Sequence, residues 1–293
     1  MSLQGLYCPI TTPFVDERIS FTKLAENLEK WNRLELAGYV VLGSTGENVY
    51  LSPGEKLELV RIARENIPAD RKLIVGAGCE STAETEVLIQ KTAERGADAV
   101  LVITPHYYKG PLLDRVLSEH FLHVAETSPL PVIVYNVPKF TGVDVSAAVV
   151  KQLRVHPKIV GIKESTNDFS KLTEISELSS DGFGVLVGNA AFFYPGLVLG
   201  AQGAVLALAN FAGEACLEIY RAFSQGSQKE ALRRFLQVRK AAQFIIGRLG
   251  IPGIKAAMDL SGYYGGAPRR PLLPLAQESI VQVKQHLADA QLL

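Results

Sequence analysis

The segment KLIVGAGCESTAETEVLIQKTAERGADAVLVITP, Lys72–Pro105, contains the repeating unit that decides the fold. It starts with a continuous apolar run, continues as an amphipathic helical pattern between Ser81 and Gly96, and ends with a second apolar run. Runs rich in Val, Ile and Leu are typical of strands buried on both faces of a parallel sheet. Serine at the start of a helix and glycine at its end are common caps. The segment therefore predicts two parallel strands joined by a helix.

Apolar runs of this kind recur along the chain. They begin at Gly5, Tyr39, Lys72, Ala99, Pro131, Ile159, Phe183 and Gly203. Amphipathic helical patterns separate them, and their spacing fits a crossover unit of roughly thirty residues. Eight regular units favour an α/β fold of the (β/α)8 TIM-barrel type, with a doubly wound open sheet as the alternative.

The pattern changes after the last apolar run. From Phe211 onward the sequence reads as helix only, which is more helix than a barrel needs. No low-complexity linker precedes this part. We therefore expect the barrel in residues 1–225 and a C-terminal helical appendage, residues 226–293, packed on it.

Composition excludes several classes of function. The 293 residues are 47% hydrophobic, and 30 basic residues balance 30 acidic ones without clustering, so we expect no nucleic-acid or membrane partner. Three distant cysteines form no disulfide framework or zinc spacing, and no apolar run reaches membrane-spanning length, which favours a reducing, cytoplasmic location. The histidines form no metal-ligand motif, so no metal site is expected. His120 and His123, one turn apart, are interpreted as helix-surface residues.

Active sites of such barrels lie at the carboxyl ends of the strands. Four predicted strands end in polar or aromatic segments. These are GSTGEN (Gly43–Asn48), TPHYYKG (Thr104–Gly110), YNVP (Tyr135–Pro138) and KES (Lys163–Ser165). The sequence therefore places its candidate chemistry at one end of the predicted barrel.

Lys163 is the most unusual of these residues, because it continues a strand that is otherwise apolar. Side chains alternate along a strand, so Lys163 shares a face with Ser165, whereas Glu164 points the other way. An apolar pocket disfavours the ammonium form, and the neutral amine is a nucleophile that forms Schiff bases with ketones. For a lone strand-end lysine we favour a structural ion pair. Tyr135, a potential proton shuttle on the neighbouring strand, shifts the interpretation toward catalysis.

Two further segments are weak signals by themselves. GSTGE offers the hydroxyls of Ser44 and Thr45, together with glycines that let a ligand approach the backbone, and would suit a carboxylate. It can equally be an ordinary polar loop. The aromatic pair in TPHYY can be a catalytic element or an exposed interface patch.

Taken together, the motifs resemble the family of dihydrodipicolinate synthase and N-acetylneuraminate lyase. They are GSTGE, TPHYY, YNVPKFTG, GIKES, and TTPF near the start of the chain. The resemblance covers essentially the whole chain. It implies a pyruvate-dependent class I aldolase or lyase with no cofactor beyond a covalent Schiff base on Lys163. It also implies a homotetramer built as a dimer of dimers.

The resemblance assigns a role to each motif. Lys163 would be the Schiff-base lysine and Tyr135 the catalytic acid and base. Ser44 and Tyr107 would connect Tyr135 to solvent, with Tyr107 contributed by a neighbouring subunit. The predicted substrate-binding residues are Thr45 at the pyruvate carboxylate, Val205 through its backbone, Ser165 and Phe140.

The second substrate is harder to assign. Synthases of this family carry an arginine two residues after the proline of YNVP, and here Phe140 follows Lys139 instead. HYYKG and IPGIKAAMDLSGYYGGAPRRPL resemble 4-hydroxy-2-oxoglutarate aldolase of the mitochondrial type. We therefore expect cleavage of a 4-hydroxy-2-oxo acid to pyruvate and an aldehyde such as glyoxylate. The alternative is 4-hydroxy-tetrahydrodipicolinate synthase, which condenses pyruvate with aspartate semialdehyde, and a sugar-acid lyase is third. A non-catalytic keto-acid sensor is the alternative of a different class.

Overall fold

The computed structural model describes residues 1–293, in which eight parallel strands close into a barrel. The order around it is β1-β10-β9-β8-β7-β6-β5-β4. The strands are β1 Gly5–Pro9, β4 Gly38–Val41, β5 Lys72–Gly76, β6 Ala99–Ile103, β7 Val132–Asn136, β8 Ile159–Glu164, β9 Gly184–Val187 and β10 Gly203–Val205. Each overlaps one of the predicted apolar runs, and the TIM barrel is confirmed. A short antiparallel pair, β2 Phe14–Val15 and β3 Arg18–Ile19, was not predicted.

The chain forms two compact units. The first contains Met1–Gly5 and Lys72–Val205, and the second contains Leu6–Arg71 and Leu206–Leu293. A domain boundary near residue 225 stays a prediction.

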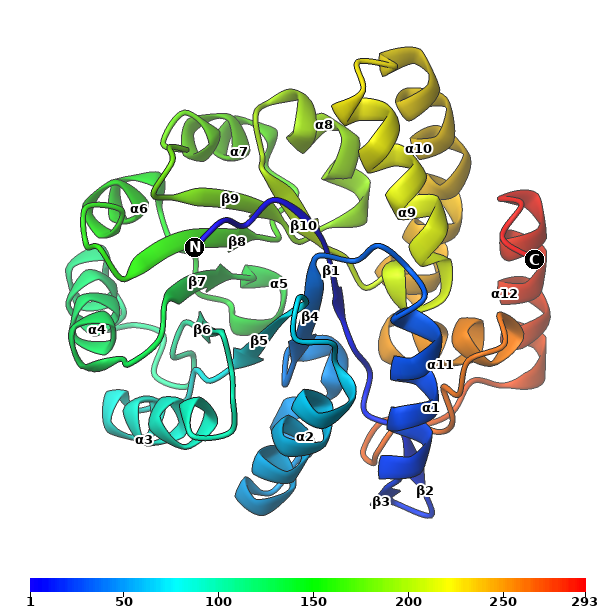
Figure 1. The fold of residues 1–293 in the computed structure, drawn as a ribbon, viewed down its shortest axis with the longest axis horizontal. Helices are drawn as coiled ribbons and strands as arrows, with labels where there is room; N and C mark the ends of the chain where they lie inside the picture. The colour runs from blue at the N-terminus through cyan, green and yellow to red at the C-terminus, as the bar shows by residue number, and fades with distance from the viewer. The chain divides into compact units, whose positions relative to one another are not determined.

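In the first unit, α3, α4, α6, α7 and α8 lie outside the strands, drawn from cyan to yellow-green in Figure 1. The helices are α3 Thr82–Ala93, α4 Asp114–Thr127, α5 Pro138–Thr141, α6 Ala147–Leu153, α7 Phe169–Ser176, the 3₁₀ turn η3 Ala190–Phe192 and α8 Phe193–Val198. The Ser81 side chain caps α3 by accepting a hydrogen bond from the Glu84 amide, as its sequence predicts. Every residue of β7 and β8 is buried, which explains why both strands are almost continuously apolar.

The second unit contains the remaining helices. They are α1 Phe21–Trp31, the 3₁₀ turns η1 Ser44–Gly46 and η2 Asn48–Tyr50, α2 Pro53–Asn66, α9 Ala209–Ser224, α10 Gln228–Ala242, the π-helical segment η4 Gln243–Arg248, α11 Gly250–Leu260 and α12 Gln277–Asp289. The predicted C-terminal helical region is thus present, drawn from yellow to red in Figure 1. No helix combines the length and apolar character needed to cross a membrane.

The C-terminal region packs on the first barrel helix. The ring of Trp31 stacks on Tyr263, with centroids 5.5 Å apart. The Asn27 side chain both donates to the Tyr264 carbonyl and accepts from the Tyr264 amide, each at 2.8 Å. These paired contacts fix the segment after α11 against α1.

The surface position expected for His120 is wrong. Its ring is buried, and Nδ1 lies 2.9 Å from the Thr82 hydroxyl oxygen. His123 is exposed, as expected, and its Nε2 lies 3.1 Å from Glu86. Both histidines contact α3, but the His120 ring is buried, whereas the His123 ring stays exposed.

Candidate active site

Lys163 and Tyr135 are direct neighbours on adjacent strands. The parallel register of β7 and β8 pairs these two residues. The Lys163 Nζ atom lies 4.0 Å from the centroid of the Tyr135 ring. Lys163 is 4% exposed and Tyr135 5% exposed. A buried amine therefore lies against the ring of Tyr135, the side chain predicted to act as its catalytic acid and base.

Ser165 belongs to the same surface as Lys163. Both side chains face Gly188, just after β9, where an added Cβ would lie 1.9 Å from Ser165 Oγ and 3.0 Å from Lys163 Cε. The glycine is thus required for the close approach of β9 to the lysine. Ser165 Oγ is buried and has no hydrogen-bond partner. A buried hydroxyl without a partner is a feature that a bound polar ligand would explain.

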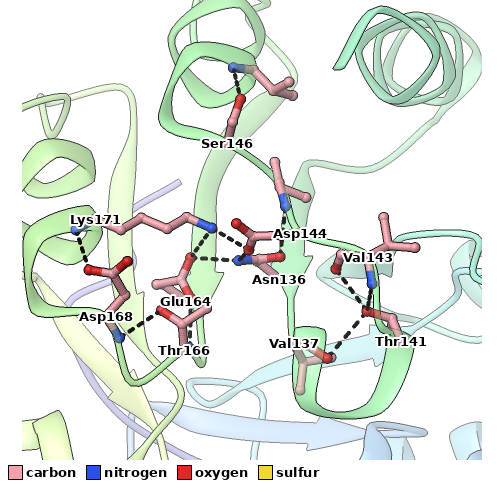
Figure 2. A network of polar contacts seen from close by, with 12 residues as sticks. Asn136, Val137, Thr141, Val143, Asp144, Ser146, Glu164, Thr166, Asp168 and Lys171 are labelled. Carbon is pink, nitrogen blue, oxygen red and sulfur yellow. Dashed lines mark hydrogen bonds and ion pairs between the residues drawn. The ribbon is translucent and has the colours of Figure 1, made fainter. Parts of the chain in front are cut away.

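Glu164 does not neutralise Lys163, as strand alternation predicts. Its side chain points to the opposite face, where Oε2 accepts a hydrogen bond from Asn136 and lies 3.6 Å from Lys171 Nζ (Figure 2). Asn136 and Glu164 form the register pair that follows Tyr135 and Lys163. The sequence analysis did not identify Lys171, because its partners come from other elements.

The segment Thr104–Gly110 ends in exposed aromatic side chains. Tyr107 is 75% exposed, and its ring packs edge-on against Tyr108 with centroids 5.0 Å apart. The backbone is held by Glu80, which accepts hydrogen bonds from the His106 and Tyr107 amides at 3.0 and 2.9 Å. The glutamate fixes this loop, and sequence reasoning missed it.

Phe140 is also exposed, in the short helix α5 that follows Tyr135. The Lys139 ammonium lies 5.9 Å from the Phe140 ring centroid. Lys109 reaches the same segment, because a Cβ on Gly142 would lie 2.9 Å from its Nζ. One ammonium group therefore lies near the Phe140 ring and another near Gly142, in the segment where the resemblance leads one to expect a guanidinium.

The GSTGEN segment forms a tightly held loop within the second unit. Ser44 and Thr45 lie in η1, and the Thr12 hydroxyl donates to the Gly46 carbonyl at 2.6 Å. Glu47 has a left-handed backbone with φ of 55°, which is uncommon for a residue other than glycine. Its buried carboxylate pairs with Lys255 of α11 at 2.7 Å.

Val205 is buried at the carboxyl end of β10, and its backbone contact with pyruvate stays a prediction. The structure thus brings Lys163, Tyr135 and Ser165 together. It describes Ser44 and Thr45 in the other unit, and their roles stay predictions.

Comparison with known proteins fits this geometry. The model of the Dihydrodipicolinate synthetase family matches residues 2–290. The chain belongs to this family. The enzyme class expected from the sequence, a class I pyruvate-dependent lyase, is thereby confirmed.

Several similar proteins carry synthase names. A 4-hydroxy-tetrahydrodipicolinate synthase from Methanothrix thermoacetophila is 34% identical over 97% of this chain and 96% of its own. A monomeric dihydrodipicolinate synthase variant of known structure has a TM-score of 0.94 at 26% identity, covering 99% of this chain and 98% of its own. A prophage protein of the family from E. coli K12, solved in complex with pyruvate, has a TM-score of 0.93 at 26% identity, with 99% of both chains covered.

Proposed function

We propose that Lys163 forms a Schiff base with the ketone carbon of pyruvate. The observation that carries the proposal is the buried Nζ atom against the Tyr135 ring, with the adjacent carboxylate of Glu164 engaged elsewhere. The amine adds to the carbonyl carbon and water leaves, which gives an iminium. Loss of a methyl proton then gives an enamine. We propose no separate cofactor, because the iminium itself accepts the electron pair.

The enamine carbon attacks an aldehyde, and the resulting alkoxide takes up a proton. The new iminium is then released from Lys163 in one of two ways, and both restore the amine. Water gives an open-chain 2-oxo acid, whereas an amino group of the aldehyde substrate, where it has one, replaces the lysine nitrogen and closes a cyclic imine. Cleavage is the same sequence in reverse. Tyr135 is the proposed donor and acceptor of these protons, since its ring centroid lies 4.0 Å from the Lys163 amine.

For the second substrate we propose aspartate semialdehyde, which makes the protein a 4-hydroxy-tetrahydrodipicolinate synthase. The similar proteins support this choice, because the Methanothrix protein and six further relatives at 30–33% identity share that name. None of these relatives is a 4-hydroxy-2-oxoglutarate aldolase, the activity placed first in the sequence interpretation. That first choice has no support among them.

One observation keeps the aldolase as a second candidate. The segment Pro138–Gly142 contains no arginine, so a bidentate clamp on a carboxylate is not available there. Lys109 and Lys139 supply point charges instead. Two ammonium groups fit an aldehyde that bears a carboxylate, a description that covers both aspartate semialdehyde and glyoxylate.

The deciding experiment compares kcat/KM for condensation of pyruvate and aspartate semialdehyde with kcat/KM for cleavage of 4-hydroxy-2-oxoglutarate. A ratio in favour of condensation supports the synthase. A preference for cleavage overturns it and establishes the aldolase. Pyruvate binding without turnover of either substrate would establish the sensor.

The remaining assignments belong to the same proposal. The loop with Ser44 and Thr45 holds the pyruvate carboxylate, the Val205 backbone contacts pyruvate, and Tyr107 acts in a neighbouring subunit. We propose a homotetramer in the cytoplasm, on the strength of the exposed aromatic loop and the family. A monomeric dihydrodipicolinate synthase variant of similar structure is known, and the test of the proposed assembly is therefore its oligomeric state in solution.

A further inference from the structure

Four polar side chains form a cluster behind the proposed catalytic pair, on the face of the strands that points away from Lys163 and Tyr135. We call it the outer network, and it consists of Asn136, Asp144, Glu164 and Lys171. Figure 2 shows these side chains pointing toward one another from β7, the loop before α6, β8 and α7. The network therefore joins four separate segments of the first unit.

Asn136 uses all of its hydrogen-bonding groups in the network. Its Nδ2 donates to Asp144 Oδ1 at 2.9 Å and to Glu164 Oε2 at 2.8 Å. Its Oδ1 accepts from the Val145 amide at 3.0 Å. Asn136, the residue after Tyr135, is thus held through both its amide nitrogen and its amide oxygen. Its bond to the Val145 amide fixes the end of the loop that carries Phe140.

Lys171 supplies the only positive charge of the outer network. Its ammonium pairs with Asp144 and lies 3.6 Å from Glu164 Oε2. Glu164 is buried, and its other oxygen accepts from the Thr166 amide at 2.7 Å. A buried carboxylate needs such compensation, so loss of the ammonium would leave Glu164 without a cation.

The strand register connects the outer network to the proposed catalytic pair. Asn136 pairs with Glu164 in the row that directly follows Tyr135 and Lys163. Because neighbouring residues of a strand point to opposite faces, fixing one row from outside fixes the backbone of the row inside. The distance between the Tyr135 ring and the Lys163 amine therefore depends on the outer network, whose side chains do not contact the substrate.

We propose that Lys171 is a positioning residue, which acts through Glu164 and Asn136 to hold Tyr135 against Lys163. The inference rests on the proposed function, since it concerns the geometry of Schiff-base formation. Misplacement of reacting groups by about 1 Å can slow a reaction roughly 100-fold. A role of this kind would change the rate at the lysine as well as the stability of the fold.

The test measures the rate at which pyruvate and borohydride trap Lys163, at saturating pyruvate and below the melting temperature. For Lys171→Met we expect trapping roughly 10- to 100-fold slower than in the wild type. Lys171→Arg should restore most of the rate, because it keeps the charge. Lys151→Met is the matched control, since that exposed lysine of α6 belongs to no ion pair, and it should trap at the wild-type rate.

A Lys171→Met protein that is less stable but traps at the wild-type rate would overturn the proposal, because it would show a structural role only. If that variant does not fold, Asp144→Ala replaces it, since the Asp144 side chain is half exposed. For Asp144→Ala we expect slower trapping of Lys163 and a raised KM for the aldehyde. A trapping rate and a KM that both equal the wild-type values would also overturn the proposal. Absence of any adduct in the wild type would instead refute the Schiff base itself.

Discussion

At the scale of single residues, Gly188 determines how closely β9 can approach the reactive amine. Its position leaves no room for a side chain, because a Cβ would overlap Ser165 Oγ and touch Lys163 Cε. A larger residue here would therefore displace Lys163, the proposed nucleophile, and Ser165, a predicted substrate-binding residue.

For Gly188→Ala we expect kcat/KM to fall roughly 10- to 100-fold, because the added methyl displaces Ser165 and Lys163. Gly182→Ala is the control, since nothing lies within 4 Å of its Cβ position. Steady-state kinetics with pyruvate, together with a melting curve, checks the prediction. Equal kinetics in the two variants would show that the site tolerates the displacement.

His120 makes folding depend on pH. Burial, with a smaller contribution from the charge of His123, lowers the pKa of His120 from 6.5 to about 4, although Glu86 acts in the opposite direction. Between these values the unfolded chain binds the proton more strongly. The contribution of neutral His120 to the free energy of unfolding is therefore fully present above pH 6.5 and is lost as the pH falls toward 4. The shift in the His120 pKa corresponds to a contribution of about 3 kcal/mol.

Urea unfolding at several pH values between about 7 and 4, which span the two pKa values of His120, measures this effect. His120→Gln should show a smaller decrease in unfolding free energy across this window than the wild type. His123→Gln, at an exposed position, should keep most of the wild-type slope. A His120→Gln slope equal to that of the wild type would assign the pH dependence to other groups.

At the scale of secondary-structure elements, a buried ion pair joins α11 to the loop after β4. All three donors of the Lys255 ammonium are used: it pairs with Glu47 at 2.7 Å and donates to the Thr12 and Ala267 carbonyls at 2.8 and 3.0 Å. Glu47 also accepts from the Arg269 amide. The C-terminal region thus holds the loop that carries Ser44 and Thr45.

For Lys255→Met we expect a loss of about 3–5 kcal/mol in unfolding free energy, because Glu47 would keep a buried charge without a cation. The double variant Glu47→Gln/Lys255→Met should recover much of this loss, since it removes both charges. Chemical denaturation of the three proteins gives the comparison. A double variant as unstable as the single one would show that packing of the lysine, rather than its charge, matters.

The elements themselves could be predicted from the sequence to different degrees. The eight barrel strands were found because each is a nearly continuous apolar run, and α3 because its Ser81 cap is local. The pair β2 and β3 has only two residues in each strand, too few for a periodic signal.

The same limit applies to the candidate site. Lys163 and Tyr135 were found because both sit at strand ends, and alternation alone separates Lys163 from Glu164. Lys171 and Lys255 were missed, because their charges are explained only by partners that the fold brings from distant segments. His120 was misjudged for the same reason, since its burial depends on α3.

At the scale of the whole molecule, the exposed aromatic loop is the feature most directly connected with assembly. Tyr107 and Tyr108 project from Thr104–Gly110, and Leu113 beyond it is also exposed. Exposed apolar groups of this kind often mark protein interfaces.

We expect light scattering after size-exclusion chromatography to detect a tetramer or dimer of the wild type. The Tyr108→Asp variant should be shifted toward the monomer and should lose activity. Tyr107→Phe is the matched variant, because it removes only a hydroxyl. It should keep the assembly and lower kcat by roughly 10-fold or more, as for a residue that relays protons. A fully active monomer would contradict the role proposed for Tyr107.

The central claim is that the Lys163 amine is the nucleophile of a pyruvate-dependent enzyme. Its most direct test is incubation with pyruvate and borohydride, followed by peptide mass analysis of the wild type and of Lys163→Ala. The account predicts one reduced pyruvate on Lys163 in the wild type, and none in a folded Lys163→Ala protein that has lost its activity. A wild-type protein without the adduct, or with the adduct on another lysine, would contradict it.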